Sequence, residues 1–147
     1  MTDNNDAQTQ QQPPISAQGT FDVTVTPQPP DDEAENVPVS RRSIDKRFHG
    51  DLEATSKGQM LAVGTDVEGS AGYVAMEQVT GTLHGHSGTF ALQHSGTMTR
   101  GTPRLAVTVV PDSGTAQLIG LSGTLTIEIV DGQHRYDFAY TLPESRS

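Results

Sequence analysis

Apolar and polar residues alternate along most of the chain after residue 17. Near the start of this region Phe21, Val23 and Val25 alternate with polar residues, and the same two-residue period recurs almost to the C-terminus. This period places successive side chains on opposite faces of a strand. No segment shows the 3.6-residue period of an amphipathic helix of useful length. The pattern therefore predicts eight strands, within residues 21–26, 44–50, 52–65, 73–83, 89–99, 105–110, 118–130 and 135–142.

The connections predict that these strands follow one another in meander order. Asp131-Gly132 between two alternating segments is the strongest short hairpin signal. Pro111-Asp112-Ser113-Gly114 indicates another tight turn, and a turn near Ser56-Lys57-Gly58 is expected within the less regular segment 52–65. With Asp131-Gly132 as the loop, three cross-strand pairs follow: Ile127 with Tyr136, Leu125 with Phe138, and Gly123 with Tyr140.

A second hairpin is predicted around His84-Gly85-His86-Ser87. Counting outward from the centre of this turn places Glu77 directly opposite His94 and Gly81 opposite Phe90. A ring that covers a cross-strand glycine is a known way to tolerate glycine in a bent strand. A shift of one residue would send one partner of each pair to the other face of the sheet.

Glycines inside the predicted strands point to a closed fold. Gly96 and Gly123 interrupt alternating segments, and interior strand glycines mark the sharp bends that a small barrel needs at its corners. The alternation is apolar toward one face and rich in threonine and serine on the other, as in an antiparallel sheet with one solvated face. We therefore predict an all-β fold, a closed eight-stranded antiparallel meander β-barrel with its apolar side inward.

Composition divides the chain into a barrel and flanking segments. Only 33% of the residues are hydrophobic, and the deficit is concentrated in the Gln-rich residues 1–17, which are predicted to form a disordered tail. Residues 18–142 are predicted to form the single barrel domain, with a mobile loop rich in proline and acidic residues at 27–41. Residues 143–147 are expected to be a short C-terminal tail.

Charge and cysteine content exclude several classes of function. The 147-residue chain has a formal net charge of −9, which makes nucleic acid and anionic membranes poor partners. It has no cysteine, which excludes disulfides, thiol nucleophiles and zinc–thiolate sites. No apolar run approaches membrane-spanning length, and the N-terminus lacks the features of a secretory signal. We therefore expect a cytoplasmic protein.

Three polar residues share the predicted inward face. Glu77 and His94 lie among apolar neighbours on their strands, and Lys46 lies between Ile44 and Phe48. A buried carboxylate and imidazole are costly unless they are paired. As catalytic residues, Glu77 and His94 would form an acid–base pair, because a carboxylate orients an imidazole that acts as a general base. The simpler interpretation is a satisfied polar network, completed by Lys46, that only rigidifies the barrel.

Aromatic residues of the inward face are candidates to line a ligand cavity. Eight strands leave room for packed side chains or for one small ligand, so the rings either surround a ligand or fill the core. Lys46 alone either anchors an acidic ligand, or reacts as a Schiff-base amine, or extends its amine to water. The predicted ligand-binding residues are Lys46, Phe48, Tyr73, Glu77, Phe90, His94, Tyr136, Phe138 and Tyr140.

The histidines suggest a metal site only weakly. His84 and His86 have the spacing that places two rings on one side of a strand, but they flank a glycine at a hairpin tip. Nothing places His49 or His134 nearby as a third ligand, and no carboxylate ligand is present in the local sequence. We therefore expect no metal site and no cofactor.

Several separated blocks of the sequence resemble a known bacterial family. They are Lys46-Arg47-Phe48-His49-Gly50-Asp51-Leu52, Gly81-Thr82-Leu83, Gln93-His94-Ser95-Gly96-Thr97-Met98 and Val110-Pro111-Asp112-Ser113-Gly114-Thr115. In this order they resemble the family called domain of unknown function 3224, over roughly residues 18 to 142. The resemblance implies a closed eight-stranded antiparallel barrel similar to plant allene oxide cyclase, of the calycin-like kind. It implies no activity, and fold similarity alone assigns no function.

Three functions fit these observations. The first is a small-molecule-binding barrel, with a hydrophobic lumen, a buried polar cluster and a small hydrophobic molecule as ligand. The second is an isomerase or lyase that uses Glu77 and His94 in the same cavity. The third is a structural or oligomerising barrel with a filled core, and the threonine-rich outer faces are compatible with a homo-oligomer. The residues leave open whether the protein is an enzyme.

Overall fold

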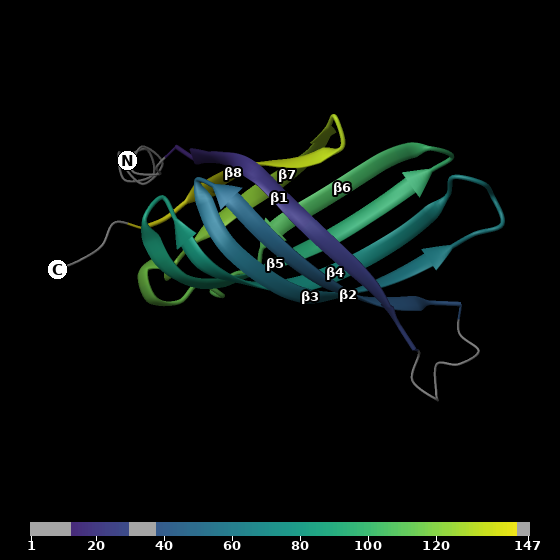
Figure 1. Cartoon of the computed structure of the whole chain (residues 1–147), viewed down its shortest axis with the longest axis horizontal. Helices are drawn as coiled ribbons and strands as arrows, with labels where there is room; N and C mark the ends of the chain where they lie inside the picture. The colour runs from purple at the N-terminus through teal and green to yellow at the C-terminus, as the bar shows by residue number, and fades with distance from the viewer. Residues whose placement is uncertain (1–12, 30–37, 144–147) are drawn as a thin grey trace, which may run out of the picture.

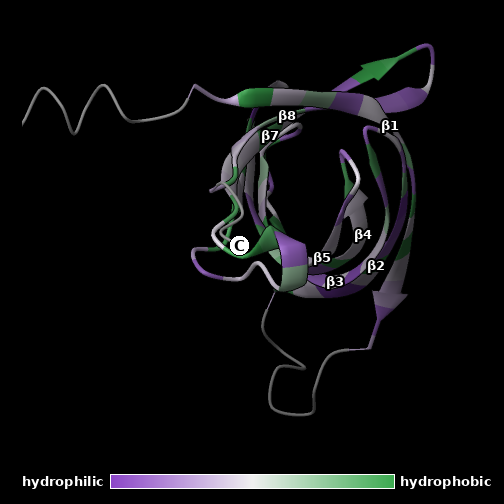
Figure 2. Cartoon of the chain, turned by 90° about the vertical axis from the view of Figure 1, so that its left-hand side faces the viewer, coloured by the Kyte–Doolittle hydropathy of each residue, from purple (hydrophilic) through white to green (hydrophobic). Residues whose placement is uncertain are grey.

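The computed structural model describes residues 13–29 and 38–143, which form an antiparallel barrel (Figure 1). In chain order the strands are β1 (Ile15–Gln28), β2 (Ser40–Gly50), β3 (Leu52–Gly64), β4 (Ala71–Leu83), β5 (His86–Thr99), β6 (Thr102–Val109), β7 (Ser122–Val130) and β8 (Gln133–Thr141), with the short 3-10 helix η2 (Ala116–Leu118) before β7. Each strand pairs with the next, and β8 pairs with β1. Viewed along its axis, the sheet forms a ring (Figure 2). The predicted closed eight-stranded meander barrel is confirmed for the described residues. Within them, no helix is long and apolar enough to cross a membrane.

The long strand β1 closes the barrel because it pairs on both sides. Its first part, Ile15 to Phe21, pairs with β8, and its larger part, Gly19 to Gln28, pairs with β2. At Gly19 a Cβ atom would overlap both the carbonyl oxygen of His49 and the ring of Tyr136. Only glycine therefore fits at this position, where β1 pairs with both β2 and β8.

The described strands extend beyond the predicted domain limits. β1 begins at Ile15, inside the segment predicted as a tail, because Ile15 and Ala17 pair with Tyr140 and Phe138. The remainder of that tail, residues 1–12, lies outside the described residues. Strands also enter the predicted loop 27–41 from both sides, and its central residues 30–37 lie outside the described residues. Of the predicted C-terminal tail, residues 144–147 lie outside as well.

The hairpin between β4 and β5 corrects one predicted register. Its loop is His84-Gly85, both with positive φ (46° and 83°), as a tight two-residue turn requires. Leu83 therefore pairs with His86, and the pairing moves by two residues from the predicted one. Glu77 lies opposite Leu92 instead of His94, and Gly81 lies opposite Gly88 instead of Phe90. Because strand side chains alternate with a period of two, the shift leaves every side chain on its predicted face.

Two further predictions of local structure were wrong. The expected turn near Ser56-Lys57-Gly58 lies inside the continuous strand β3, which pairs with β2 and β4 on its two sides. The strand predicted from Leu118 starts only at Ser122, because η2 and Gly120, with a φ of 86°, turn the chain first. The pairing predicted around Asp131-Gly132 is confirmed in full: Ile127 with Tyr136, Leu125 with Phe138, and Gly123 with Tyr140.

One half of the barrel is filled by packed apolar side chains. Leu118 and Leu121, from the connection between β6 and β7, are 0% and 1% exposed and belong to the core. Aromatic rings pack beside them, with Phe90 stacked on Phe138 at 5.9 Å between centroids. The rest of this core consists of Ala17, Phe21, Phe48, Leu52, Ala54, Val79, Leu83, Leu92, Val107, Val109, Leu125, Tyr136 and Tyr140.

The opposite end of the barrel is open. Here Met98, Leu105 and Ile129 keep the inward-facing alternation of their strands, yet they are 40%, 42% and 63% exposed. On the same side, β6 and β7 share only one described pair, Thr108 with Thr124. Their backbones are therefore unpaired along most of the seam toward the open end. The division into a filled half and an open half is what positions the candidate site.

Candidate functional site

Four consecutive strands place polar side chains at the boundary between the two halves. Glu77 from β4 is the centre of this polar cluster, which is completed by Lys46, Ser56 and His94 from β2, β3 and β5. Lys46 Nζ donates to Glu77 Oε1 at 2.9 Å, and Ser56 Oγ donates to Oε2 at 2.5 Å. His94 Nε2 lies 2.5 Å from Oε1. Both carboxylate oxygens are therefore hydrogen-bonded.

Glu77 and His94 contact each other diagonally across the hairpin. His94 pairs with Ala75, so its strand position is two residues away from the position facing Glu77. Long side chains reach such diagonal neighbours on one face of an antiparallel pair. Gly58, opposite Glu77 on the other side, leaves space for the carboxylate side chain, since a Cβ there would overlap Glu77.

The polar cluster holds an ionised carboxylate away from water. Burial by itself raises the pKa of Glu77, but the hydrogen bond from His94 and the Lys46 charge outweigh it, and the pKa falls to about 2. The Lys46 ammonium also lies 4.9 Å from the centroid of the Phe21 ring, a cation–π distance. The side chains of Lys46 and Glu77 are 7% and 0% exposed. The ion pair is thus almost fully desolvated.

The two nitrogens of His94 have different environments. Nε2 faces the Glu77 carboxylate, whereas Nδ1 makes no hydrogen bond within the described part of the chain. In the neutral ring, Nε2 then carries the proton that Glu77 accepts, and Nδ1 keeps a lone pair. This arrangement suits a general base or a hydrogen-bond acceptor for a ligand.

Tyr73 lies between the polar cluster and the open end. It pairs with Gly96, two residues from His94 toward the open end, and its ring occupies the space that a side chain at Gly96 would take. Burial, and then the negative charge of Glu77, raise the pKa of the Tyr73 phenol. Tyr73 is therefore neutral at physiological pH and forms the floor of the open end.

A groove of about 440 Å³ lies above Tyr73 in the open end. It is formed by strands β2 to β6, and most of its surface is apolar side chain and glycine backbone. It will be called the mouth groove. Its lining residues are Ser40, Arg42, Met60, Ala62, Val63, Gly64, Ala71, Gly72, Tyr73, Gly96, Thr97, Met98, Pro103, Arg104 and Leu105.

The structure separates the predicted site residues into three groups. Lys46, Glu77 and His94 meet in the polar cluster. Tyr73 lines the mouth groove. The other predicted ligand-binding residues belong to the packed core and are at most 3% exposed: Phe48, Phe90, Tyr136, Phe138 and Tyr140.

The tyrosine hydroxyls of the packed half have structural partners. Tyr136 Oη accepts a hydrogen bond from the Leu52 amide at 2.9 Å and lies 3.0 Å from the His49 carbonyl oxygen, to which it donates. Burial raises the pKa of Tyr136 to about 12. Tyr140 Oη lies 2.5 Å from His84 Nδ1. These hydroxyls hold turns at the filled end of the barrel.

The histidines considered as metal ligands are dispersed. His84 contacts Tyr140, and His86 Nδ1 lies 3.3 Å from the Leu83 carbonyl oxygen. His49 lies 3.3 Å from an oxygen of Asp22, and the ring of His134 packs on Phe21. In the described segments no three His, Asp or Glu side chains gather as a metal site would require.

Ser56 and the arginines of the mouth groove were not among the residues predicted from the sequence. Ser56 has the inward alternation of Ala54 and Gly58, which could have identified it, but the predicted turn at this position hid that alternation. Arg42 likewise has the parity of Ile44 and Lys46 and is therefore on the inward side of β2.

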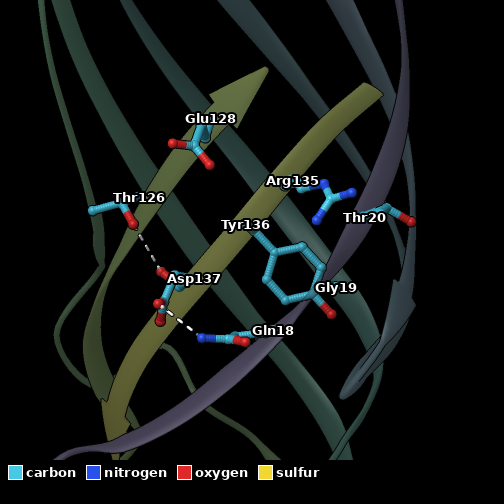
Figure 3. Close-up of a pocket in the computed structure, with 8 residues that line it drawn as sticks. All are labelled: Gln18, Gly19, Thr20, Thr126, Glu128, Arg135, Tyr136 and Asp137. Carbon is cyan, nitrogen blue, oxygen red and sulfur yellow. Dashed lines mark hydrogen bonds between the residues drawn. The ribbon is translucent and has the colours of Figure 1, made fainter. Parts of the chain in front are cut away.

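A second, larger hollow of about 590 Å³ lies on the outer face of β1, β7 and β8 (Figure 3). Asp137 already holds several of its polar groups. The Asp137 carboxylate accepts hydrogen bonds from Gln18 Nε2 and Ser16 Oγ, both at 3.1 Å, and Thr126 Oγ1 donates to the Asp137 carbonyl at 3.3 Å. The hollow does not reach the polar cluster, and we assign the candidate site to the mouth groove.

The fold and site define an eight-stranded antiparallel barrel with one packed half and a buried polar cluster under an open mouth. The profile of the family described as protein of unknown function (DUF3224) matches residues 17–140. The chain belongs to the DUF3224 family.

A solved relative has the same fold. The crystal structure of a protein with unknown function from the DUF3224 family of Shewanella oneidensis MR-1 is 46% identical to this chain. The match covers 90% of this chain and 99% of that one, with a TM-score of 0.82. None of the functionally curated proteins matches the chain. The comparisons therefore establish the family, whose function is unknown.

Proposed function

We propose that the protein binds a small apolar molecule in the mouth groove. The observation that supports this most is the exposure of inward-facing apolar residues at the open end, among them Met98 and Leu105. Such residues are buried in a filled barrel, and apolar surface gathered in a concave site is typical of ligand pockets. The volume of about 440 Å³ lies within the usual range of roughly 300–1,000 Å³ for such pockets.

The polar cluster supports this function by keeping the lumen in one shape. Lys46, Glu77 and Ser56 join β2, β3 and β4 beneath the groove, and His94 extends the connection to β5. A buried hydrogen-bonded network of this kind rigidifies the walls of a site. A ligand in the groove would contact Tyr73 and not the Glu77 carboxylate, since Tyr73 lines the groove and Glu77 does not.

The environment-sensitive dye N-phenyl-1-naphthylamine tests this proposal. Its fluorescence should rise on binding to the protein, with a dissociation constant in the micromolar range, on the order of 1–10 μM. Ala62→Trp, which places a large ring in the groove, should weaken binding at least tenfold. Val74→Trp is the matched control because Val74 is exposed on the outer face of β4. Equal affinity of wild type and Ala62→Trp would place the dye elsewhere and refute the proposal.

A second candidate is an isomerase or lyase that uses His94 as a base. The observation that favours it is the free Nδ1 of His94 together with the Nε2 contact to Glu77. A substrate would have to pass Tyr73, since the His94 side chain is only 4% exposed. The test is incubation with a metabolite library in heavy water. Deuterium incorporation by the wild-type protein would support the enzyme if it is lost in His94→Gln while that variant still binds the dye. Wild-type protein that changes no compound would exclude it.

A further inference from the structure

We infer that the ligand of the mouth groove carries an oxyanion, such as a carboxylate, that binds Arg42 at the rim. This inference rests on the proposed ligand-binding function and adds the chemical class of the ligand. The occupant is an amphiphile with an apolar body in the groove and an anionic group at the open end.

The charges of the groove carry the inference. Among the described lining residues, Arg42 and Arg104 are the charged ones, and no Asp or Glu is among them. The whole chain has a net charge of −9, whereas the groove lining carries two arginines and no acidic side chain. Because the rest of the surface repels anions on balance, an arginine of the groove lining is the place where an anion would bind.

Neither arginine has a described partner. No hydrogen bond or ion pair forms between Arg42 or Arg104 and any other described residue. The two described lysines are both paired, since Lys46 contacts Glu77 and Lys57 contacts Asp45 at 2.7 Å. A guanidinium presents a planar array of donors that matches a carboxylate or sulfonate. Arg42 is therefore available for a ligand.

The position of Arg42 orients the ligand. It has the inward parity of β2 and lies two positions from Ile44 and four from Lys46, toward the open end. Its cross-strand neighbour is Met60, an apolar lining residue of the same groove. Lys46 is not an alternative anchor, because Glu77 already neutralises it. The anionic group thus lies at the rim and the apolar body points toward Tyr73.

Two dyes of one shape test the inference. The anionic dye 1-anilinonaphthalene-8-sulfonate is N-phenyl-1-naphthylamine with an added sulfonate. We expect Arg42→Gln to weaken binding of the anionic dye about tenfold, since a charge-assisted hydrogen bond is lost. Binding of the neutral dye should weaken less than about twofold. Arg104→Gln should act in the same direction, and the double variant should act most strongly. Arg47→Gln is the control, because Arg47 is exposed on the outward face of β2 and should change neither affinity.

Competition then extends the test from a sulfonate to a carboxylate. Naphthalene-2-carboxylate should displace the neutral dye better than 2-naphthylmethanol, and the advantage should disappear in Arg42→Gln. If the neutral dye binds the groove but Arg42→Gln affects both dyes equally or neither, the inference fails and the proposed function stands. If Ala62→Trp does not weaken binding of the neutral dye, the proposed function fails, and the inference fails with it.

Discussion

Glu77 and His94 are two positions out of direct register across β4 and β5, yet His94 Nε2 lies 2.5 Å from Glu77 Oε1. The diagonal contact brings Glu77 within reach of Lys46 and Ser56 on the other side, so that one carboxylate joins four strands. Its role in the fold and its position under the open mouth lead to the following expectations.

Removing the charge of Glu77 alone should destabilise the barrel strongly. Glu77→Gln leaves the Lys46 ammonium buried without its counter-charge, and breaking a buried pair costs about 3–5 kcal/mol. Lys46→Met combined with Glu77→Gln removes that charge, and the double variant should be more stable than the sum of the two single effects predicts. Urea unfolding followed by circular dichroism measures both. Glu128→Gln, at an exposed position, should change stability by less than about 0.5 kcal/mol. Additive single effects would show that the pair is not coupled.

The stability of the barrel should fall in acid through Glu77. Its folded pKa of about 2 lies below the ordinary value of 4.5, so the unfolded chain binds the proton more tightly. The stabilising effect of the ionised group is therefore complete above pH 4.5 and is lost as the pH falls toward 2. It is on the order of 3 kcal/mol. Unfolding free energies measured from about pH 6 to about pH 3 should fall less steeply in Glu77→Gln than in wild type. An equal loss of unfolding free energy with falling pH in the two proteins would show that Glu77 does not cause the acid destabilisation.

Gly96 should be intolerant of a side chain because of Tyr73. A Cβ at Gly96 would overlap the Tyr73 ring, and the strain should cost about 1–3 kcal/mol. Gly72, in the neighbouring pair of the same two strands, is the matched control, since the nearest atom to a Cβ there is 3.8 Å away. Thermal unfolding of Gly96→Ala and Gly72→Ala compares the two. A similar loss in both variants would show a general cost of replacing strand glycines instead of a specific clash.

The seam between β6 and β7 should open more easily than the rest of the wall. These strands share one described pair, whereas β3 and β4 pair along their whole length. Backbone amides without strand partners exchange quickly with solvent. Hydrogen exchange followed by nuclear magnetic resonance should therefore show less protection in β6 than in β4. Equal protection of the two strands would mean that the seam is closed in solution.

The sequence predicted the faces of the barrel better than its registers. Alternation placed Lys46, Glu77 and His94 inward, and the two-residue error in the β4–β5 hairpin did not affect this result because strand side chains repeat with a period of two. The error arose because either of two neighbouring dipeptides of His84-Gly85-His86 can form the loop. Positive φ at His84 and Gly85 selects the first.

Other features depend on three-dimensional curvature that alternation does not encode. The alternation treats Met98 and Phe90 as equivalent inward residues of β5, yet Met98 is 40% exposed and Phe90 only 1%. The difference arises because Leu118 and Leu121 fold into one end of the barrel and nothing described fills the other. Ser56 reaches the polar cluster because β3 is one continuous strand, in which Ser56 faces inward. The turn predicted at this position gave no such orientation.

The most direct test of the account is the location of a bound apolar probe. Isotope-labelled protein titrated with N-phenyl-1-naphthylamine should show its largest amide and methyl shifts at the mouth groove, at Tyr73, Gly96 and Met98. Residues of the filled half, such as Phe90 and Leu118, should shift little. Shifts confined to the filled half or to the outer hollow, or no shifts at saturating dye, would contradict the claim that the open mouth is a ligand site.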